Sequence, residues 1–240
     1  LCWSSCTNEV DEFIGNVEPS TRSVSTALNA NLASLFTGGA PTLTSAEIKE
    51  VNDAYAKMTS INCYRNIDEA VRNKTSYAGT IFLDDTYASA YFRKGSLAFP
   101  PYGILASSME HEFIHMYQRD VQGKKVDTDK EKRDTGMMEF ELAFYQGIIR
   151  YIHAGYSWTF KGEDGDPSYQ SLWTSGLTDP SLIPQYEREF QTYVASICAN
   201  GKPTSIDINE FVKWSNIFGE YSRGYSGKGY KFGNYDYGTS

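Results

Sequence analysis

The sequence predicts an α+β fold that is mainly helical and has a small mixed sheet. Apolar residues recur at the three- and four-residue spacing of helices over most of the chain, and only residues 80–99 break into short strand-like segments. A chain of 240 residues with 40% hydrophobic content can bury a core of its own. We expect a single domain over residues 1–240, with helices and the sheet to about 100, two long helices over about 101–155 and a helical part over about 156–240.

The first elements are expected to be helices. The Ser-, Thr- and Asn-rich stretch Glu18–Thr44 predicts one helix, which ends before a turn at Thr37–Pro41. Thr44 and Glu47 then have the spacing of a capping box, and the apolar residues after them predict a helix over 45–59. Ile67–Asn73 predicts a further short helical turn.

Three short segments with strand character follow, separated by polar or glycine-containing breaks. They are Thr80–Asp85, Ala90–Arg93 and Ser96–Phe99. Pro100 ends this region. A helix then begins either at Pro101 or at a second capping box, Ser107–Glu110, and ends before Gly123.

This helix carries the pattern His-Glu-x-x-His, with histidines at positions 111 and 115. Side chains four residues apart project from one helical face, so the imidazoles of His111 and His115 can bind a single cation. Glu112, beside the first histidine, can hold and deprotonate a water molecule at that cation. Other residues form the apolar stripe of the helix: Met109, Phe113, Met116 and Tyr117.

A second helix, predicted over Met137–Ala154, supplies a third ligand. Catalytic zinc commonly takes three protein ligands and leaves a fourth position for water. This helix is strongly apolar, and carboxylates within it are costly unless a cation neutralises one of them. We prefer Glu139 to Glu141, because the small residue Ala143 one turn later would let two helices approach closely. Two further helices are expected over about 186–197 and 208–214.

The composition excludes some classes of protein. The net charge of −8 leaves no basic stripe to neutralise phosphates, so a nucleic-acid partner is not expected. No apolar run reaches the roughly 18 residues that a membrane span needs. The chain also lacks the Gly-x-Ser-x-Gly motif of serine hydrolases.

The four cysteines lack the paired Cys-x-x-Cys spacing of a structural zinc site. We expect two disulfides, Cys2–Cys6 and Cys63–Cys198, although four cysteines allow three pairings and buried free thiols are the alternative. Disulfides and a content of 15% aromatic residues favour a secreted, periplasmic or cell-surface bacterial protein whose leader has been removed.

The His-Glu-x-x-His segment and the later segment Glu139-Phe140-Glu141-Leu142 resemble zincin metallopeptidases of the Glu-zincin type, including uncharacterised secreted bacterial zinc metallopeptidases. In several such families the first Glu of a Glu-x-Glu-Ala segment binds zinc. The likeness covers about residues 95–155 and implies a zincin-like fold. Gln118 and Val121 stand where a metzincin has Gly and His, so that subclass is excluded.

The resemblance implies a zinc-dependent peptidase. His111, His115 and Glu139 would bind zinc, and Glu112 would be the general base toward a zinc-activated water. An oxyanion donor is also needed, with His153 our first choice and then Tyr145 and Tyr156. In zincins the strand before the motif helix often pairs with substrate, which here indicates the segment 96–99.

Two alternatives remain open. The chain could be a catalytically silent binding module with a zincin fold that recognises peptide or glycan through its aromatic C-terminal region, Phe218–Tyr237. It could also keep the zinc and act as an amidase on cell-wall material. The intact Glu112 favours an enzyme, because a pure binder has no need of a base.

Overall fold

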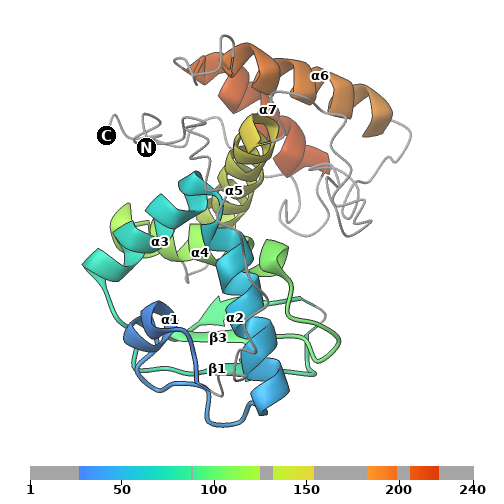
Figure 1. Cartoon of the computed structure of the whole chain (residues 1–240). Helices are drawn as coiled ribbons and strands as arrows, with labels where there is room; N and C mark the ends of the chain where they lie inside the picture. Colours follow the sequence, from blue (N-terminus) through green and yellow to red (C-terminus); the bar gives the residue numbers. More distant parts are fainter. Residues whose placement is uncertain (1–26, 88, 125–131, 154–182, 199–205, 222–240) are drawn as a thin grey trace, which may run out of the picture. The chain divides into compact units, whose positions relative to one another are not determined.

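The computed structural model describes residues 27–87, 89–124, 132–153, 183–198 and 206–221. They fall into two compact units, which divide between Gly123 and Lys124 and are called here the N-terminal unit and the C-terminal unit. Helices dominate, and the described strands form one small sheet with parallel and antiparallel pairs, which confirms the predicted fold class (Figure 1). The arrangement as one zincin-like domain stays a prediction.

The N-terminal unit begins with three helices, which are α1 (Ala30–Leu35), α2 (Ser45–Thr59) and α3 (Asn62–Lys74). The predicted bounds of α2 and its capping box are confirmed, since Thr44 accepts a hydrogen bond from the backbone N–H of Glu47 and the Glu47 carboxylate accepts one from the backbone N–H of Thr44. In the described residues the first expected helix is α1, which ends before the turn at Thr37–Pro41 as predicted. The helical turn expected from Ile67 belongs to a longer helix.

The three strands are β1 (Ile81–Leu83), β2 (Tyr91–Arg93) and β3 (Ser96–Phe99). Their order is β1-β3-β2, and β3 pairs parallel with β1 and antiparallel with β2. Lys94 and Gly95, with φ of 50° and 78°, form the two-residue turn between β2 and β3, which is the backbone conformation that tight hairpins favour. Because β3 is paired on both sides, it has no free edge, and its expected pairing with substrate is wrong.

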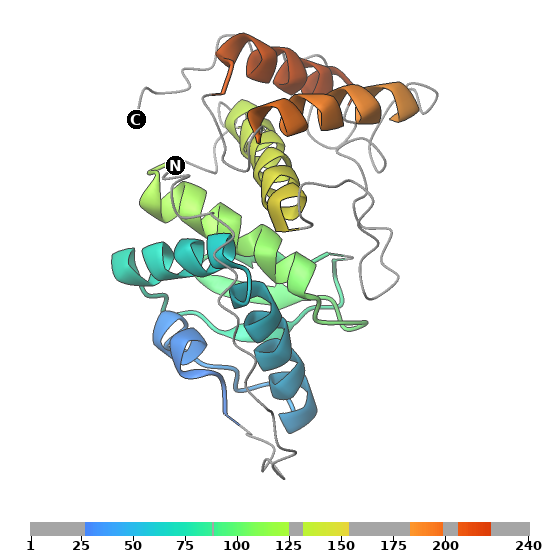
Figure 2. The same cartoon turned by 45° about the horizontal axis from the view of Figure 1, so that its top comes forward.

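The motif helix is α4 (Ala106–Met116), and it continues as the π-helical turn η2 (Tyr117–Val121). It packs against α2 and α3 and also contacts β2 (Figure 2). Three residues of the predicted apolar stripe are fully buried: Met109, Phe113 and Met116. The N-cap is Leu105, without a side-chain capping hydrogen bond, so the second capping box does not form.

The described helices of the C-terminal unit are α5 (Lys132–His153), α6 (Ile183–Ile197) and α7 (Ile208–Tyr221), and α5 packs against the other two. The three helices lie close to where the hydrophobic periodicity predicts them. None of the helices within the described ranges is both long and apolar enough to cross a membrane.

Aromatic side chains form the core of the C-terminal unit. The ring centroids of Phe144 and Phe211 lie 5.1 Å apart in an edge-to-face contact, and Phe190 makes a similar contact with Trp214 at 5.5 Å. Edge-to-face pairs of this kind stabilise a core beyond the area that they bury. The apolar character that predicted α5 therefore serves to cover α6 and α7.

The cysteines correct one prediction. Cys63 is disulfide-bonded, whereas Cys198 is a free, buried thiol at the end of α6. The expected Cys63–Cys198 bond is therefore wrong. The thiol of Cys198 is instead buried in the apolar core of the C-terminal unit. The expected Cys2–Cys6 bond lies outside the described residues.

Candidate metal centre

The geometry of α4 brings two histidines together. The Nε2 atoms of His111 and His115 lie 3.1 Å apart, and their rings meet edge to face with centroids 4.8 Å apart. Zinc–imidazole bonds of about 2.0–2.1 Å in a tetrahedral site place two ligand nitrogens about 3.3 Å apart. The two nitrogens are therefore already near the separation that one cation requires. Both side chains are half-buried.

Glu112 is buried next to this pair. Its side chain is only 6% exposed, and its Oε1 lies 4.0 Å from Nε2 of His111. A carboxylate this close to a ligand nitrogen is in position to take a proton from a water molecule beside the cation. The structure thus places the predicted general base next to the predicted ligands.

The third predicted ligand lies on α5. Glu139 is half-buried on that helix, and its role as a ligand together with His111 and His115 stays a prediction. The carboxylate of Glu141 is buried and forms an ion pair with Lys124, so it already has a cationic partner. Of the two carboxylates that the sequence left open, Glu139 is therefore the better candidate.

The predicted oxyanion donors are less well supported. His153 is exposed at the last residue of α5, fourteen residues after Glu139, which is about 21 Å along the helix axis. An oxyanion donor must reach to about 3 Å from the reacting oxygen. The role of His153 stays a prediction, and its distance from Glu139 along α5 argues against it. Tyr145 is half-buried on α5, and Tyr156 lies outside the described residues.

Gln118 is a residue of the candidate site that the sequence did not predict. Its side chain is fully buried, and its Oε1 lies 3.0 Å from Nδ1 of His115. The available signal was its spacing, because residues three apart on a helix are neighbours. The sequence pattern used Gln118 only to exclude the metzincin subclass.

The turn that carries Gln118 is tied to the sheet by its next two residues. Asp120 accepts a hydrogen bond from the Tyr77 hydroxyl and is paired with Arg119, whose Nε donates over 2.9 Å. The guanidinium of Arg119 lies 4.4 Å from the ring centroid of Phe92 on β2. Burial and the bond to Asp120 raise the pKa of Tyr77, so its hydroxyl remains a donor. These contacts hold the end of the motif helix in place.

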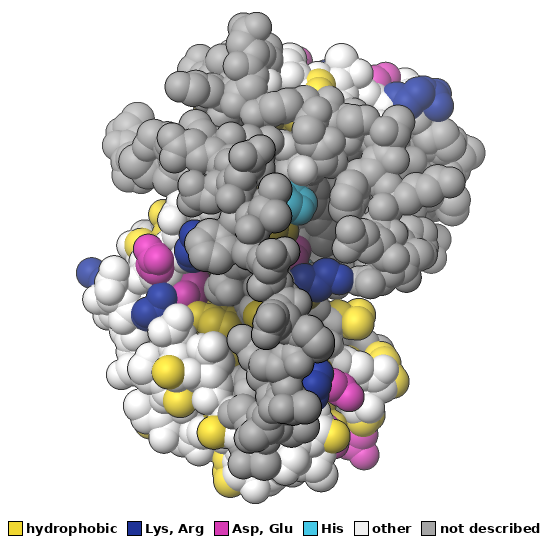
Figure 3. All heavy atoms as spheres, viewed as in Figure 1, with side chains coloured by type: hydrophobic (Ala, Val, Ile, Leu, Met, Phe, Trp, Pro, Cys, Tyr) yellow, Lys and Arg dark blue, Asp and Glu magenta, His cyan; other side chains and the backbone are white. Residues whose placement is uncertain are grey.

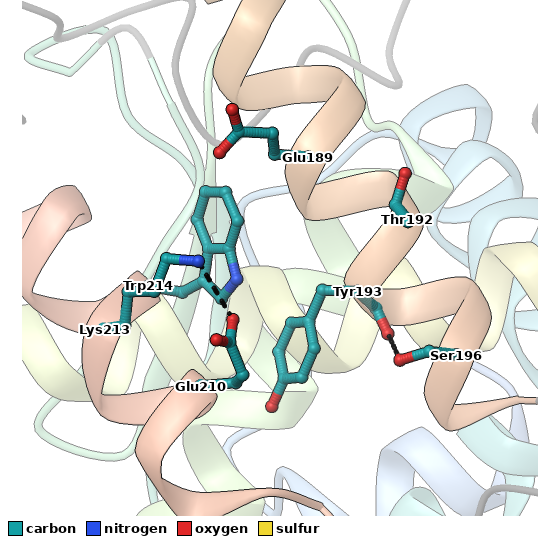
Figure 4. Close-up of a pocket in the computed structure, with 7 residues that line it drawn as sticks. All are labelled: Glu189, Thr192, Tyr193, Ser196, Glu210, Lys213 and Trp214. Atoms are coloured by element: carbon teal, nitrogen blue, oxygen red, sulfur yellow. Dashed lines mark hydrogen bonds and ion pairs between the residues drawn. The ribbon is translucent and has the colours of Figure 1, made fainter.

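A shallow pocket also lies between α6 and α7 of the C-terminal unit (Figure 4). Tyr193 and Trp214 line it, together with Lys213, whose ammonium donates to Glu210 over 3.1 Å and lies 5.0 Å from the Trp214 ring centroid. None of the candidate metal ligands lines this pocket. On the face shown in Figure 3, the described acidic and basic side chains lie interspersed.

Comparisons with protein-family models, with curated proteins and with solved structures find no match to this chain. The resemblance of the motif residues to Glu-zincins therefore stays a prediction.

Proposed function

We propose that this protein is a zinc-dependent hydrolase that cleaves peptide bonds. His111, His115 and Glu139 are the proposed zinc ligands, and Glu112 is the proposed general base. The observation that carries the proposal is the convergence of the two Nε2 atoms to 3.1 Å with a buried carboxylate beside them. A helix with two adjacent histidines alone would suit a structural metal, whereas the neighbouring buried Glu112 suits catalysis.

The chemistry of the donor set fits zinc. Imidazole nitrogen and carboxylate oxygen are its usual ligands in hydrolases, and two histidines with one glutamate are a known catalytic set. Such a set leaves one coordination position open. When bound, zinc would supply a Lewis acid that polarises the scissile carbonyl and lowers the pKa of water.

Glu112 would transfer the proton. Its carboxylate takes a proton from water as the water oxygen bonds to the carbonyl carbon of the peptide. It then gives that proton to the amide nitrogen as the C–N bond breaks, so that the products are a carboxylic acid and an amine, which exchange a proton to become a carboxylate and an ammonium. Burial excludes competing solvent from this carboxylate and holds it in one position.

An extended peptide could pair with β2. The outer side of β1 is already used, since the N–H of Ile81 donates to the carbonyl of Gly39 over 2.8 Å. β3 is paired on both sides, so among the described residues β2 is the remaining edge of the sheet, and it also contacts α4. Strand addition of this kind would bind the peptide through its backbone hydrogen bonds, with little selectivity for its side chains. We also propose an exported bacterial protein, a setting that permits the disulfide at Cys63.

The first experiment is metal analysis by mass spectrometry on full-length protein purified without chelator or added metal. We expect one zinc per chain in the native protein and none in His115→Ala. No metal even after zinc supplementation would refute the hydrolase proposal and favour the silent binding module.

The second experiment separates binding from catalysis. Glu112→Gln should keep the zinc and lose about 100-fold or more in cleavage of a mixed peptide library, the scale expected for a general base. Glu110→Gln, which changes another buried carboxylate on α4, is the matched control and should keep its activity. A native rate in Glu112→Gln would remove Glu112 from this role. Zinc binding with cleavage of cell-wall peptides alone would favour the amidase.

A further inference from the structure

Gln118 is an unusual residue to find fully buried at this position. A primary amide carries two donor hydrogens and an acceptor oxygen, and its burial costs free energy unless hydrogen bonds replace those to water. One of its contacts is to a candidate metal ligand, because Oε1 of Gln118 lies 3.0 Å from Nδ1 of His115. The burial of Gln118 is therefore best explained by its contact with His115.

The contact determines which nitrogen of His115 carries the proton. The Oε1 atom of an amide only accepts, so Nδ1 of His115 must be the donor. In a neutral imidazole the other nitrogen then has a free lone pair, and for His115 that nitrogen is Nε2, which faces His111. His115 is therefore held in the form that binds a cation through Nε2.

The same reasoning fixes the state of His111. The two Nε2 atoms lie 3.1 Å apart, and Nε2 of His115 is already an acceptor. Nε2 of His111 must then donate its proton to it when no metal is present. A cation that takes both nitrogens displaces this one proton, which returns to the same ring at Nδ1. The side chain of His111 is 35% exposed, so water can carry the exchange.

We propose that Gln118 is a positioning residue that fixes His115 as the Nδ1–H tautomer, so that metal binding requires a tautomer change in His111 alone. This inference rests on the proposed metal site and adds to it the residue that orients one ligand. Partners of this kind fix ring orientation and increase ligand basicity, and their loss typically costs 10–100-fold in metal affinity.

The fold keeps Gln118 rigid enough for this role. The π-helical turn η2 begins directly after α4, and its backbone bond from the N–H of Gln122 to the carbonyl of Tyr117 spans five residues. The contacts of Arg119 and Asp120 to Tyr77 and Phe92 anchor that turn to the sheet side of the unit. Wider turns of this type within helices frequently occur at functional sites.

The first test reads the tautomers directly. The chain has only three histidines, so nitrogen-15 labelling of histidine gives three ring systems, and His153 on α5 is an internal reference. At pH 8, above the ordinary imidazole pKa of about 6.5, we expect Nδ1–H for His115 with and without zinc. We expect His111 to change from Nε2–H to Nδ1–H when zinc is added.

The second test measures zinc affinity by competition with a chromophoric chelator. Gln118→Met, which keeps the length and removes the acceptor, should weaken zinc binding by about 10–100-fold. Gln118→Glu restores an acceptor and should bind zinc at least as tightly as the native protein. Gln122→Met is the matched control, because Oε1 of Gln122 is buried without a hydrogen-bond partner, and it should change affinity by no more than about twofold.

The outcomes separate this inference from the proposed function. Native zinc affinity in Gln118→Met, or an Nε2–H form of His115 in the native protein, would overturn the role of Gln118 and leave the zinc site intact. A loss of affinity in Gln118→Glu as large as in Gln118→Met would also overturn it. Absence of zinc binding by the native protein would instead refute the proposed function and, with it, the role of Gln118 toward zinc.

Discussion

Two carboxylates on α5 should respond in opposite ways to the same substitution. Glu139 is the proposed third zinc ligand, whereas Glu141 is paired with Lys124. Replacement of either residue with Gln keeps the side-chain size and removes the charge. We expect Glu139→Gln to lose zinc and Glu141→Gln to lose stability.

The magnitudes follow from the surroundings of each residue. Loss of a direct ligand should exceed the upper end of the 10–100-fold effect of an outer partner, so Glu139→Gln should weaken zinc binding by at least about 100-fold, or about 2.7 kcal/mol. In Glu141→Gln the ammonium of Lys124 loses its anionic partner while its side chain is only 19% exposed. Removal of one partner from a largely buried pair should cost about 1–3 kcal/mol in the free energy of unfolding.

Both quantities can be measured on the full chain. Zinc affinity comes from chelator competition, and stability comes from urea unfolding in the presence of chelator, followed by hydrogen exchange of α5 peptides so that the two units are read separately. Glu139→Gln should unfold like the native protein under chelator. If Glu141→Gln lost the zinc and Glu139→Gln kept it, the assignment of the third ligand would be wrong.

Three further predictions concern stability and reactivity. Asp68→Asn should destabilise the N-terminal unit by about 2–4 kcal/mol, read from hydrogen exchange of α3, because buried Asp68 accepts from Tyr55 over 2.8 Å and from Nε of Arg72 over 2.9 Å. Burial raises the pKa of the Cys198 thiol to about 11, so Cys198 should resist alkylation at pH 8 until urea unfolds the C-terminal unit, and rapid alkylation of the folded protein would contradict its burial. Hydrogen bonds at the α2 capping box lower the pKa of Glu47 from 4.5, so the ionised Glu47 stabilises the start of α2 above pH 4.5 and this stabilisation is lost as the pH falls below it. Amide exchange at the start of α2 should therefore be slower in the native protein than in Glu47→Gln near neutral pH, and the two rates should become equal in acid.

The elements that the sequence predicted well are those with local determinants. The start of α2 depends on hydrogen bonds between Thr44 and Glu47, three residues apart, and its length follows from apolar spacing within one helix. The pairing of His111 and His115 is local in the same sense, because helix geometry alone puts residues four apart on one face. No contact distant in sequence is needed for either feature.

The features that were missed depend on contacts between distant residues or on irregular backbone. The central place of β3 follows from its pairing with both β1 and β2, and strand order is not encoded in the residues of one strand. The pairing of Cys63 could not be read from spacing, since four cysteines allow three pairings. The spacing of Gln118 from His115 places the two side chains close together, but its burial depends on the π-helical turn that Tyr77 and Phe92 contact, and such a turn has no sequence pattern of its own.

The choice between a hydrolase and a silent binding module depends most on Glu112. A buried carboxylate lowers stability relative to an apolar residue at the same position unless its partners offset the cost of removing it from water. The two histidines do not need Glu112 to approach a cation, since helix spacing already sets their Nε2 atoms 3.1 Å apart. A binding module would have no use for the charge of Glu112, whereas a hydrolase needs a base at this distance from the ligand nitrogens. For this reason the comparison of Glu112→Gln with native protein, at equal zinc content, is the decisive test of the function.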